Sequence, residues 1–135
     1  MRIDVHYRED LDTVLFRWIG QVEMAAALDA LQAHFDAHNT NRSIHDLRQA
    51  DFNSVSLSDL QELSRGSAST AGTRAQPRRA AIVTPGIMQS VVRLYSAVDV
   101  AESNPIDFEW FFDPAEAAAW LGLEAVPADW FGADT

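Results

Sequence analysis

After an initial hairpin, segments with the periodicity of strands alternate with segments that have the periodicity of helices. Ile3, Val5 and Tyr7 alternate with polar residues, and residues 14–19 repeat this pattern after a polar turn, as two half-buried strands do. Further strands are predicted at residues 43–47, 80–83 and 106–112. A helix-like segment precedes each of them, and parallel neighbouring strands need such crossovers. The order therefore predicts an α/β domain whose later strands are parallel.

Helices are predicted where apolar residues recur every three or four positions. The stripes of the first three helices are Met24, Leu28, Leu31 and Phe35, then Leu57, Leu60 and Leu63, then Ile87, Val91, Leu94 and Val98. Ser58 and Gln61 have the spacing of a capping box at the start of the second helix, with Ser56 as a competing cap. This helix is expected to fray near Gly72.

The last predicted helix has the clearest boundaries in the chain. Asp113 is an N-cap acid, Pro114 occupies the first turn, and Glu116 completes the capping pattern. Gly122 stands where a left-handed residue commonly ends a helix, and Leu123 can supply the apolar contact that accompanies it. We therefore predict a helix that ends at residue 121.

These segments predict one α/β domain over residues 1–124 and a tail over residues 125–135, because 135 residues are the size of a single domain. The expected architecture is a mixed five-stranded sheet in the order β-β-α-β-α-β-α-β-α. Its central strands are parallel, its first strand is antiparallel at an edge, and the helices pack on the sheet. In the tail, Trp130 and Phe131 should either dock onto the domain or contact another chain.

Composition excludes several classes of chemistry. All ten basic residues are arginine, so no lysine can form a Schiff base or bind phosphates in a Walker loop. The chain has no cysteine, which removes thiol chemistry and fits the cytoplasm as the expected location. A formal net charge of −10 disfavours nucleic acid as a partner. No apolar stretch approaches the roughly 20 residues that span a bilayer, so we expect no membrane insertion.

Neither a catalytic site, a metal site nor a cofactor is predicted. His34 and His38 are four residues apart, but no third ligand accompanies them, so we expect both on the solvated face of the first helix. His45 and Asp46 do not form a hydrolase triad, because adjacent strand residues point to opposite faces and no nucleophile elbow is present.

Four segments of the chain resemble the SpoIIAA-like family of the STAS/SEC14-like fold. They are residues 46–48 (Asp-Leu-Arg), 79–85 (Arg-Ala-Ala-Ile-Val-Thr-Pro), 93–95 (Arg-Leu-Tyr) and 112–121 (Phe-Asp-Pro-Ala-Glu-Ala-Ala-Ala-Trp-Leu). Together with the order of elements, the resemblance covers roughly residues 10–122. It implies a fold shared with anti-sigma-factor antagonists on one side and with lipid-transfer domains on the other.

The chain departs from the antagonists at their phosphorylation switch. The resemblance implies a phosphorylatable serine two residues after the aspartate that follows the strand, and here Arg48 stands two residues after Asp46. Ser54, Ser56 and Ser58 lie downstream, but nothing supports transferring the switch to any of them.

Two candidate binding regions follow from the predicted fold. Ligands of open α/β sheets meet the loops at the carboxyl ends of the strands, which predicts a recognition surface of Asp46, Arg48, Ser56, Ser58, Thr84 and Arg93. Alternatively, an apolar pocket could be lined by Met88, Leu94, Tyr95, Phe108 and Trp110. The simpler explanations are an ion pair of Asp46 with Arg48 and ordinary core packing. A further group, Arg65, Arg74, Arg78 and Arg79, is interpreted as solvated loop charge.

The leading functional hypothesis is a non-enzymatic protein-interaction or regulatory module whose partner is another protein or a second copy of the chain. It rests on the lack of lysine, cysteine and any catalytic constellation, and on the resemblance. The alternative is a carrier or sensor of a small, lipid-like apolar ligand between the helices and the sheet.

Overall fold

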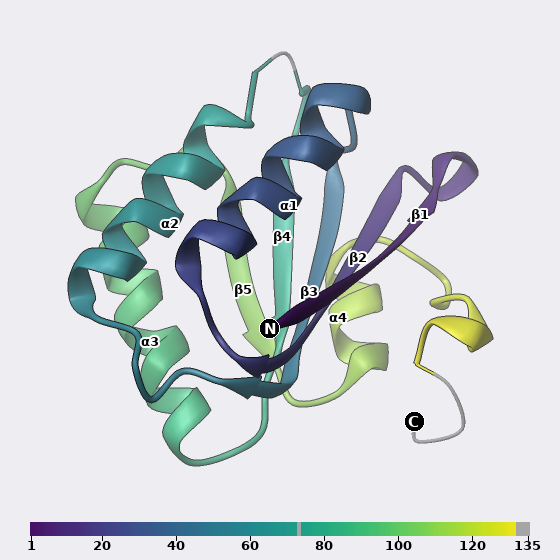
Figure 1. Ribbon diagram of the computed structural model, residues 1–135. Coiled ribbons are helices and arrows are strands. Elements are labelled where there is room, and N and C mark those ends of the chain that lie inside the picture. The colour runs from purple at the N-terminus through teal and green to yellow at the C-terminus, as the bar shows by residue number, and fades with distance from the viewer. Residues whose placement is uncertain (73, 132–135) are drawn as a thin grey trace.

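The computed structural model describes residues 1–72 and 74–131 and shows one five-stranded sheet with four α-helices (Figure 1). The strands are β1 (Arg2–Arg8), β2 (Thr13–Gln21), β3 (Arg42–Asp51), β4 (Arg78–Ile82) and β5 (Asp107–Phe111). The helices are α1 (Met24–Ala37), α2 (Leu57–Ser69), α3 (Ile87–Ala101) and α4 (Pro114–Trp120). This order of elements is the predicted one.

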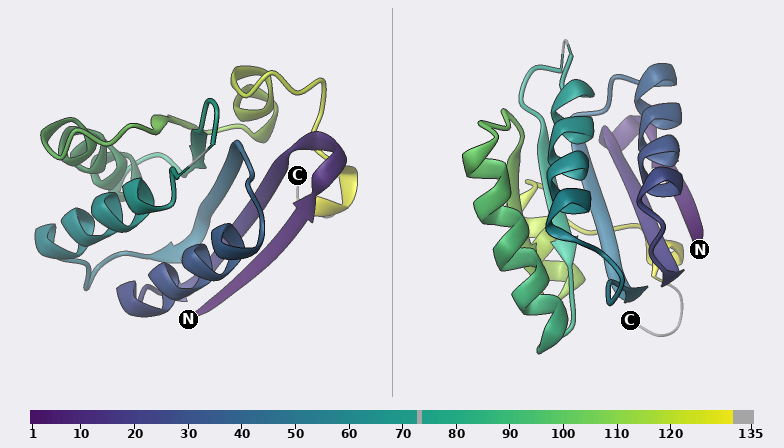
Figure 2. Two further views of the ribbon diagram at one scale, coloured as in Figure 1. Left: turned by 90° about the horizontal axis from the view of Figure 1, so that it is seen from above. Right: turned by 60° about the vertical axis from the view of Figure 1, so that its left-hand side comes forward.

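The sheet has the predicted mixed topology. Its spatial order is β1-β2-β3-β4-β5, with β1 antiparallel to β2 and every later pair parallel. Each new strand from β3 to β5 is added at the same edge of the growing sheet, so the three crossovers run in the same direction. Right-handed crossovers that run in one direction place their helices on the same face of the sheet. Helices α1, α2 and α3 therefore cover one face, while α4 and residues 121–131 cover the other (Figure 2).

A hydrophobic core lies on each face of the sheet. On β2, Phe16 and Trp18 contribute to the larger core under α1, α2 and α3, whereas Leu15 points to the smaller core under α4. Trp130 and Phe131 are buried in the smaller core. Of the two alternatives for this aromatic pair, the structure selects docking onto the domain.

The predicted capping box of Ser58 and Gln61 is wrong, and the competing cap is the one used. The Ser56 hydroxyl accepts a hydrogen bond from the backbone N–H of Asp59 at 3.1 Å, and the Asp59 carboxylate accepts one from the backbone N–H of Ser56 at 2.9 Å. An aspartate thus takes the position that glutamate or glutamine usually holds in this motif. The start of α2 therefore shifts toward the N-terminus.

The predicted ends of α4 are confirmed within one residue. The Asp113 carboxylate accepts a hydrogen bond from the backbone N–H of Ala115 at 2.9 Å. Gly122 has a φ of 81°, and the N–H groups of Gly122 and Leu123 donate to carbonyls of the last helical turn. This pattern is the Schellman motif, in which a left-handed residue satisfies the last carbonyls.

Helix α3 is rotated relative to the predicted stripe, of which Val98 is buried and Val91 is half-buried in the core. Ile87 and Leu94 are 72% and 47% exposed. The buried positions are Met88, Val92, Tyr95, Val98 and Asp99. Because α3 carries apolar residues on its outer side as well, periodicity alone does not select the stripe that faces the sheet. The α2 stripe is also shorter than predicted, since Leu57 is exposed.

Candidate functional site

A small cavity lies between the sheet and helices α2 and α3. Its volume is about 30 Å³, which is room for about two water molecules. The polar residues in its wall are His45, Arg79 and Tyr95. The rest of the lining is apolar and consists of Trp18, Leu47, Phe52, Leu60, Leu63, Ala81, Val91, Val92 and Phe108.

His45 is neutral and held in place by aromatic neighbours. The indole N–H of Trp18 donates a hydrogen bond to Nδ1 of His45 at 3.2 Å. The imidazole stacks on Phe16 with ring centroids 5.0 Å apart. Burial, together with the nearby Arg79 guanidinium, holds the pKa of His45 well below its usual 6.5. The ring therefore carries no charge at pH 7.

Two polar atoms of the cavity residues are buried without a hydrogen bond. They are Nε2 of His45 and Nε of Arg79, which have no partner among the described residues. Each of the two residues is only 4% exposed. A buried polar group without a partner costs about 1–3 kcal/mol, so such atoms are expected to bind either an ordered water molecule or a polar group of a ligand.

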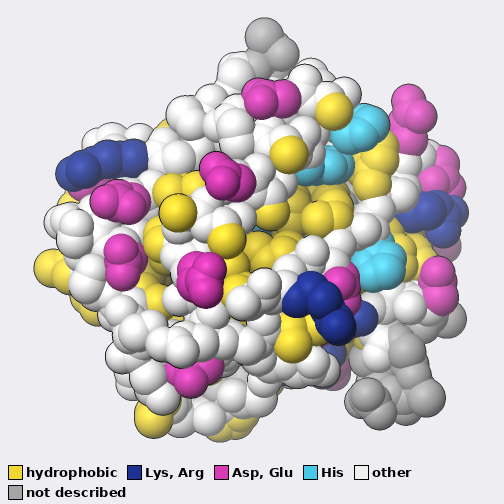
Figure 3. Space-filling view, viewed as in Figure 1, with side chains coloured by type: hydrophobic (Ala, Val, Ile, Leu, Met, Phe, Trp, Pro, Cys, Tyr) yellow, Lys and Arg dark blue, Asp and Glu magenta, His cyan; other side chains and the backbone are white. Residues whose placement is uncertain are grey.

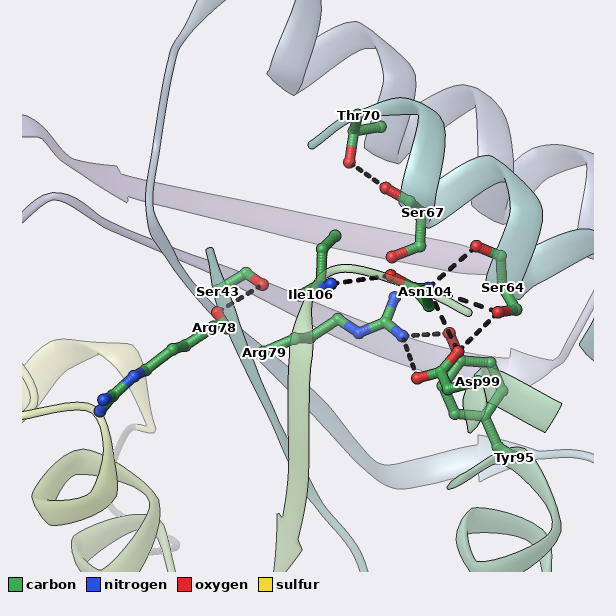
Figure 4. Close-up of polar contacts among 10 residues, drawn as sticks. All are labelled: Ser43, Ser64, Ser67, Thr70, Arg78, Arg79, Tyr95, Asp99, Asn104 and Ile106. Carbon is green, nitrogen blue, oxygen red and sulfur yellow. Dashed lines mark hydrogen bonds and ion pairs between the residues drawn. The ribbon is translucent and has the colours of Figure 1, made fainter. Parts of the chain in front are cut away.

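Arg79 belongs to a buried polar network that joins β4 to α2 and α3 (Figure 4). Its Nη2 donates to the Tyr95 hydroxyl and lies 3.4 Å from Oδ2 of Asp99. Oδ1 of Asp99 accepts from the Ser64 hydroxyl at 2.7 Å and from the side-chain amide of Asn104 at 3.2 Å. Burial raises the pKa of Tyr95 to about 12, so its phenol is protonated.

Two of the five residues of the predicted apolar pocket line this cavity, namely Tyr95 and Phe108. Met88 is buried elsewhere in the same core, and Leu94 lies on the outer side of α3. Trp110 is partly buried on the edge strand β5. Four of the five residues thus belong to the core layer under α1, α2 and α3 or pack against it, and the rotation of α3 accounts for the exposure of Leu94.

The six residues of the predicted recognition surface do not come together. Strand β3 has ten residues and continues past residue 47, so Asp46 lies within it and is buried. Arg48 binds the Asp46 carboxylate through two nitrogens, each 3.0 Å from an oxygen, and Arg17 lies 3.7 Å away. The Phe131 ring lies against both guanidinium groups, at 5.9 Å and 5.6 Å. The Asp46–Arg48 ion pair is thus part of the packing on the α4 face.

The other members of that surface occupy two places. Ser56 and Ser58 lie at the start of α2, and Thr84 follows β4, so all three lie near the edge where the parallel strands end. Arg93 is on α3, with its guanidinium 5.8 Å from the centre of the Trp110 ring. Acidic side chains are spread over the face of the three helices instead of forming one patch (Figure 3).

Two predictions about solvated charge are each wrong for some of their residues, although His38 and Arg65 are exposed as predicted. His34 is buried, its Nε2 lies 2.9 Å from the Thr40 hydroxyl, and burial lowers its pKa to about 4. Of the four arginines interpreted as solvated loop charge, Arg74 and Arg79 are buried. Arg74 donates to the backbone carbonyl of Thr40 at 3.0 Å and stacks on Phe35 at 4.3 Å.

Sequence reasoning missed His45 and Arg79 in the cavity wall, and Asp99 in the polar network behind it. Asp99 follows Tyr95 by four positions and Val92 by seven, so it lies on the same side of α3 as these two apolar residues. A single acidic residue on an otherwise apolar side of a helix could have indicated a buried polar network. Arg79 lies two residues before Ala81 on β4, and strand residues two apart share a face. Its position at the start of an apolar strand could have indicated burial.

No protein-family model matches the chain, and no curated protein matches it. The resemblance to the SpoIIAA-like family therefore stays a prediction, and the site is interpreted from its own geometry. In the part of the chain that the structure describes, no helix is long and apolar enough to cross a membrane. Nor do three or more metal-ligating side chains gather anywhere in that part.

Proposed function

We propose that this chain is a binding domain for a small, largely apolar molecule, held between the sheet and helices α2 and α3. The observation that carries the proposal is an apolar cavity whose lining residues include His45 and Arg79, each of which has one buried nitrogen without a hydrogen bond in the described part of the chain. Ligand sites are typically apolar, with a few polar groups that fix the orientation of the ligand. The proposed function is that of a carrier or sensor.

The size of the cavity requires α3 to move when a ligand binds. A volume of about 30 Å³ is a tenth of the roughly 300 Å³ of the smallest common ligand pockets. Residues 84–86, directly before α3, are exposed, and Gly86 at the N-cap has a φ of 102°. Such a position can absorb a change of backbone angle. Outward displacement of the first turns of α3, which carry the lining residues Val91 and Val92, would enlarge the cavity while Asp99 keeps its contacts with Arg79 and Ser64.

The geometry gives less support to a protein-interaction module. Asp46 is satisfied inside the domain by Arg48, and Ser56 is used as the cap of α2. The predicted surface is therefore divided between structural contacts on two faces. The resemblance to anti-sigma-factor antagonists favours the interaction function, whereas the cavity favours ligand binding.

Native mass spectrometry of freshly purified protein tests the proposal, together with melting experiments on protein refolded without ligand. We expect a co-purifying small molecule, or a higher Tm with medium-chain apolar compounds. A ligand at one hundred times its Kd stabilises the folded state by about 2.7 kcal/mol. For a chain of this size, that stabilisation raises Tm by roughly 5–10 °C.

Cavity-filling variants make this test specific. Val91→Phe adds bulk at the partly exposed rim of the cavity and should abolish ligand binding, and Ala81→Leu does the same from the sheet. Leu94→Phe is the matched control, because it adds bulk to the outer side of α3 and should leave binding unchanged. The proposal is refuted if no molecule co-purifies and no compound changes the Tm of the unsubstituted protein.

A further inference from the structure

We infer that the ligand presents an uncharged hydrogen-bond acceptor, such as the carbonyl oxygen of a ketone, which His45 and Arg79 bind together. This inference rests on the proposed function and names the chemical class of its ligand. Three properties of the cavity lead to it: the tautomer of His45, the donor of Arg79, and the balance of buried charge.

Trp18 determines the tautomer of His45. An indole nitrogen only donates hydrogen bonds, so Nδ1 of His45, 3.2 Å from Nε1 of Trp18, is the acceptor. A neutral imidazole with an accepting Nδ1 carries its proton on Nε2. Nε2 of His45 is therefore a buried donor, and it has no acceptor among the residues that the structure describes.

Arg79 supplies a second donor of the same kind. A guanidinium group has no acceptor, and Nε of Arg79 is buried without a partner in residues 1–72 and 74–131. The register of β3 and β4 pairs His45 with Ala81 and Arg79 with Ser43. The two residues thus lie on adjacent strands, two positions apart, with their side chains on the same face of the sheet. A carbonyl oxygen has two lone pairs and can accept from both.

The charges around the cavity are balanced without a charged ligand. Arg79 is the positive residue of the lining, and the carboxylate of Asp99 lies 3.4 Å from it. His45 is neutral, and the high pKa of Tyr95, about 12, keeps its phenol protonated. A ligand carboxylate would add a buried charge without a counter-ion, which is far more costly than burying a hydrogen-bonded carbonyl. The cavity therefore favours a neutral acceptor.

Ligands matched in chain length test this inference. The ketone 2-heptanone has the acceptor, heptanoate has a charge in its place, and heptane has neither. Titrations of the full chain followed by NMR should show 2-heptanone binding at least about tenfold more tightly than heptanoate or heptane, a difference of about 1.4 kcal/mol. The infrared carbonyl band of bound 2-heptanone should also move to lower wavenumber, because hydrogen bonds weaken the C=O bond.

Two substitutions of His45 connect this preference to the proposed donor. In His45→Gln, the side-chain oxygen can accept from Trp18 while the amide nitrogen donates into the cavity, so the preference for the ketone over heptane should persist. In His45→Phe, the ring cannot donate, so the ratio of the two affinities should fall toward one while heptane still binds.

The outcomes separate the inference from the proposed function. Tighter binding of heptanoate, or equal binding of heptane and 2-heptanone, would overturn the inference and leave a binding domain for apolar molecules. Binding of none of the three, with one ordered water molecule bridging His45 and Arg79 in a crystal structure, would overturn both. A ketone preference that persists in His45→Gln and is lost in His45→Phe supports the inference.

Discussion

Replacing Asp99 by alanine tests the buried polar network most directly. Asp99 is 7% exposed and interacts with Arg79 at 3.4 Å, Ser64 at 2.7 Å and Asn104 at 3.2 Å. Its loss leaves the buried guanidinium of Arg79 without its counter-charge, and breaking a buried pair in this way costs about 3–5 kcal/mol. That is a large part of the roughly 5–15 kcal/mol that keeps a domain folded.

Urea denaturation followed by tryptophan fluorescence measures this loss, and an unchanged m-value shows that the same surface is exposed on unfolding. Asp107→Ala is the matched control, because Asp107 is an exposed carboxylate at the start of β5. The control should change the free energy of unfolding by less than about 0.5 kcal/mol. A loss below about 1 kcal/mol in Asp99→Ala would refute the role of the network. The double change Arg79→Met with Asp99→Leu should recover part of the stability, since it removes both charges.

Three other predictions concern the caps, the buried histidines and the C-terminal segment. Ser56→Ala should lower the free energy of unfolding by about 1 kcal/mol, and Ser58→Ala by less than about 0.5 kcal/mol, because Ser56 is the cap; equal losses in urea denaturation would contradict this assignment. Burial lowers the pKa of His34 to about 4 and that of His45 well below 6.5, so the unfolded chain binds protons first as the pH falls below about 6.5. Stability should then fall by up to about 1.4 kcal/mol per pH unit for each histidine. Urea midpoints between pH 7 and pH 5 measure this slope, which should be shallower in His34→Gln and would be flat if the histidines were solvated. Phe131→Ala should cost about 3 kcal/mol because its ring is buried in the smaller core; an unchanged Tm would show that this segment does not stabilise the domain.

The order of the elements and the ends of α4 could be predicted because they depend on interactions between near neighbours. The period-two pattern of β1 and β2 is visible within seven and nine residues, the lengths of these strands. The Asp113 cap and the Gly122 turn each involve residues within one or two helical turns. Side-chain and backbone bonds of this kind form without help from distant parts of the chain.

The orientation of α3 and the end of β3 could not be predicted in the same way. Both Val92 and Ile87 are apolar, but only contact with the sheet decides that Val92 is buried and Ile87 is exposed. Similarly, β3 continues beyond residue 47 because it pairs with β2 up to Asp51. These features depend on which side of α3 packs on the sheet and on how far β3 pairs with β2. The pattern of apolar residues within one segment contains little information about such contacts between segments.

By itself, the sequence determined that this chain has alternating strands and helices, a mixed five-stranded sheet and a capped final helix. The sequence analysis interpreted Arg79 as a solvated loop charge, because other arginines lie near it in the sequence. Only the tertiary structure decided that Arg79 lies in the core. Its counter-ion Asp99 lies 20 positions from Arg79 in the sequence, and Ser64, whose hydroxyl donates to Asp99, lies 35 positions from Asp99. A buried charge is tolerated only when such distant partners surround it. The location of the candidate binding site therefore depends on contacts that exist only in the folded chain.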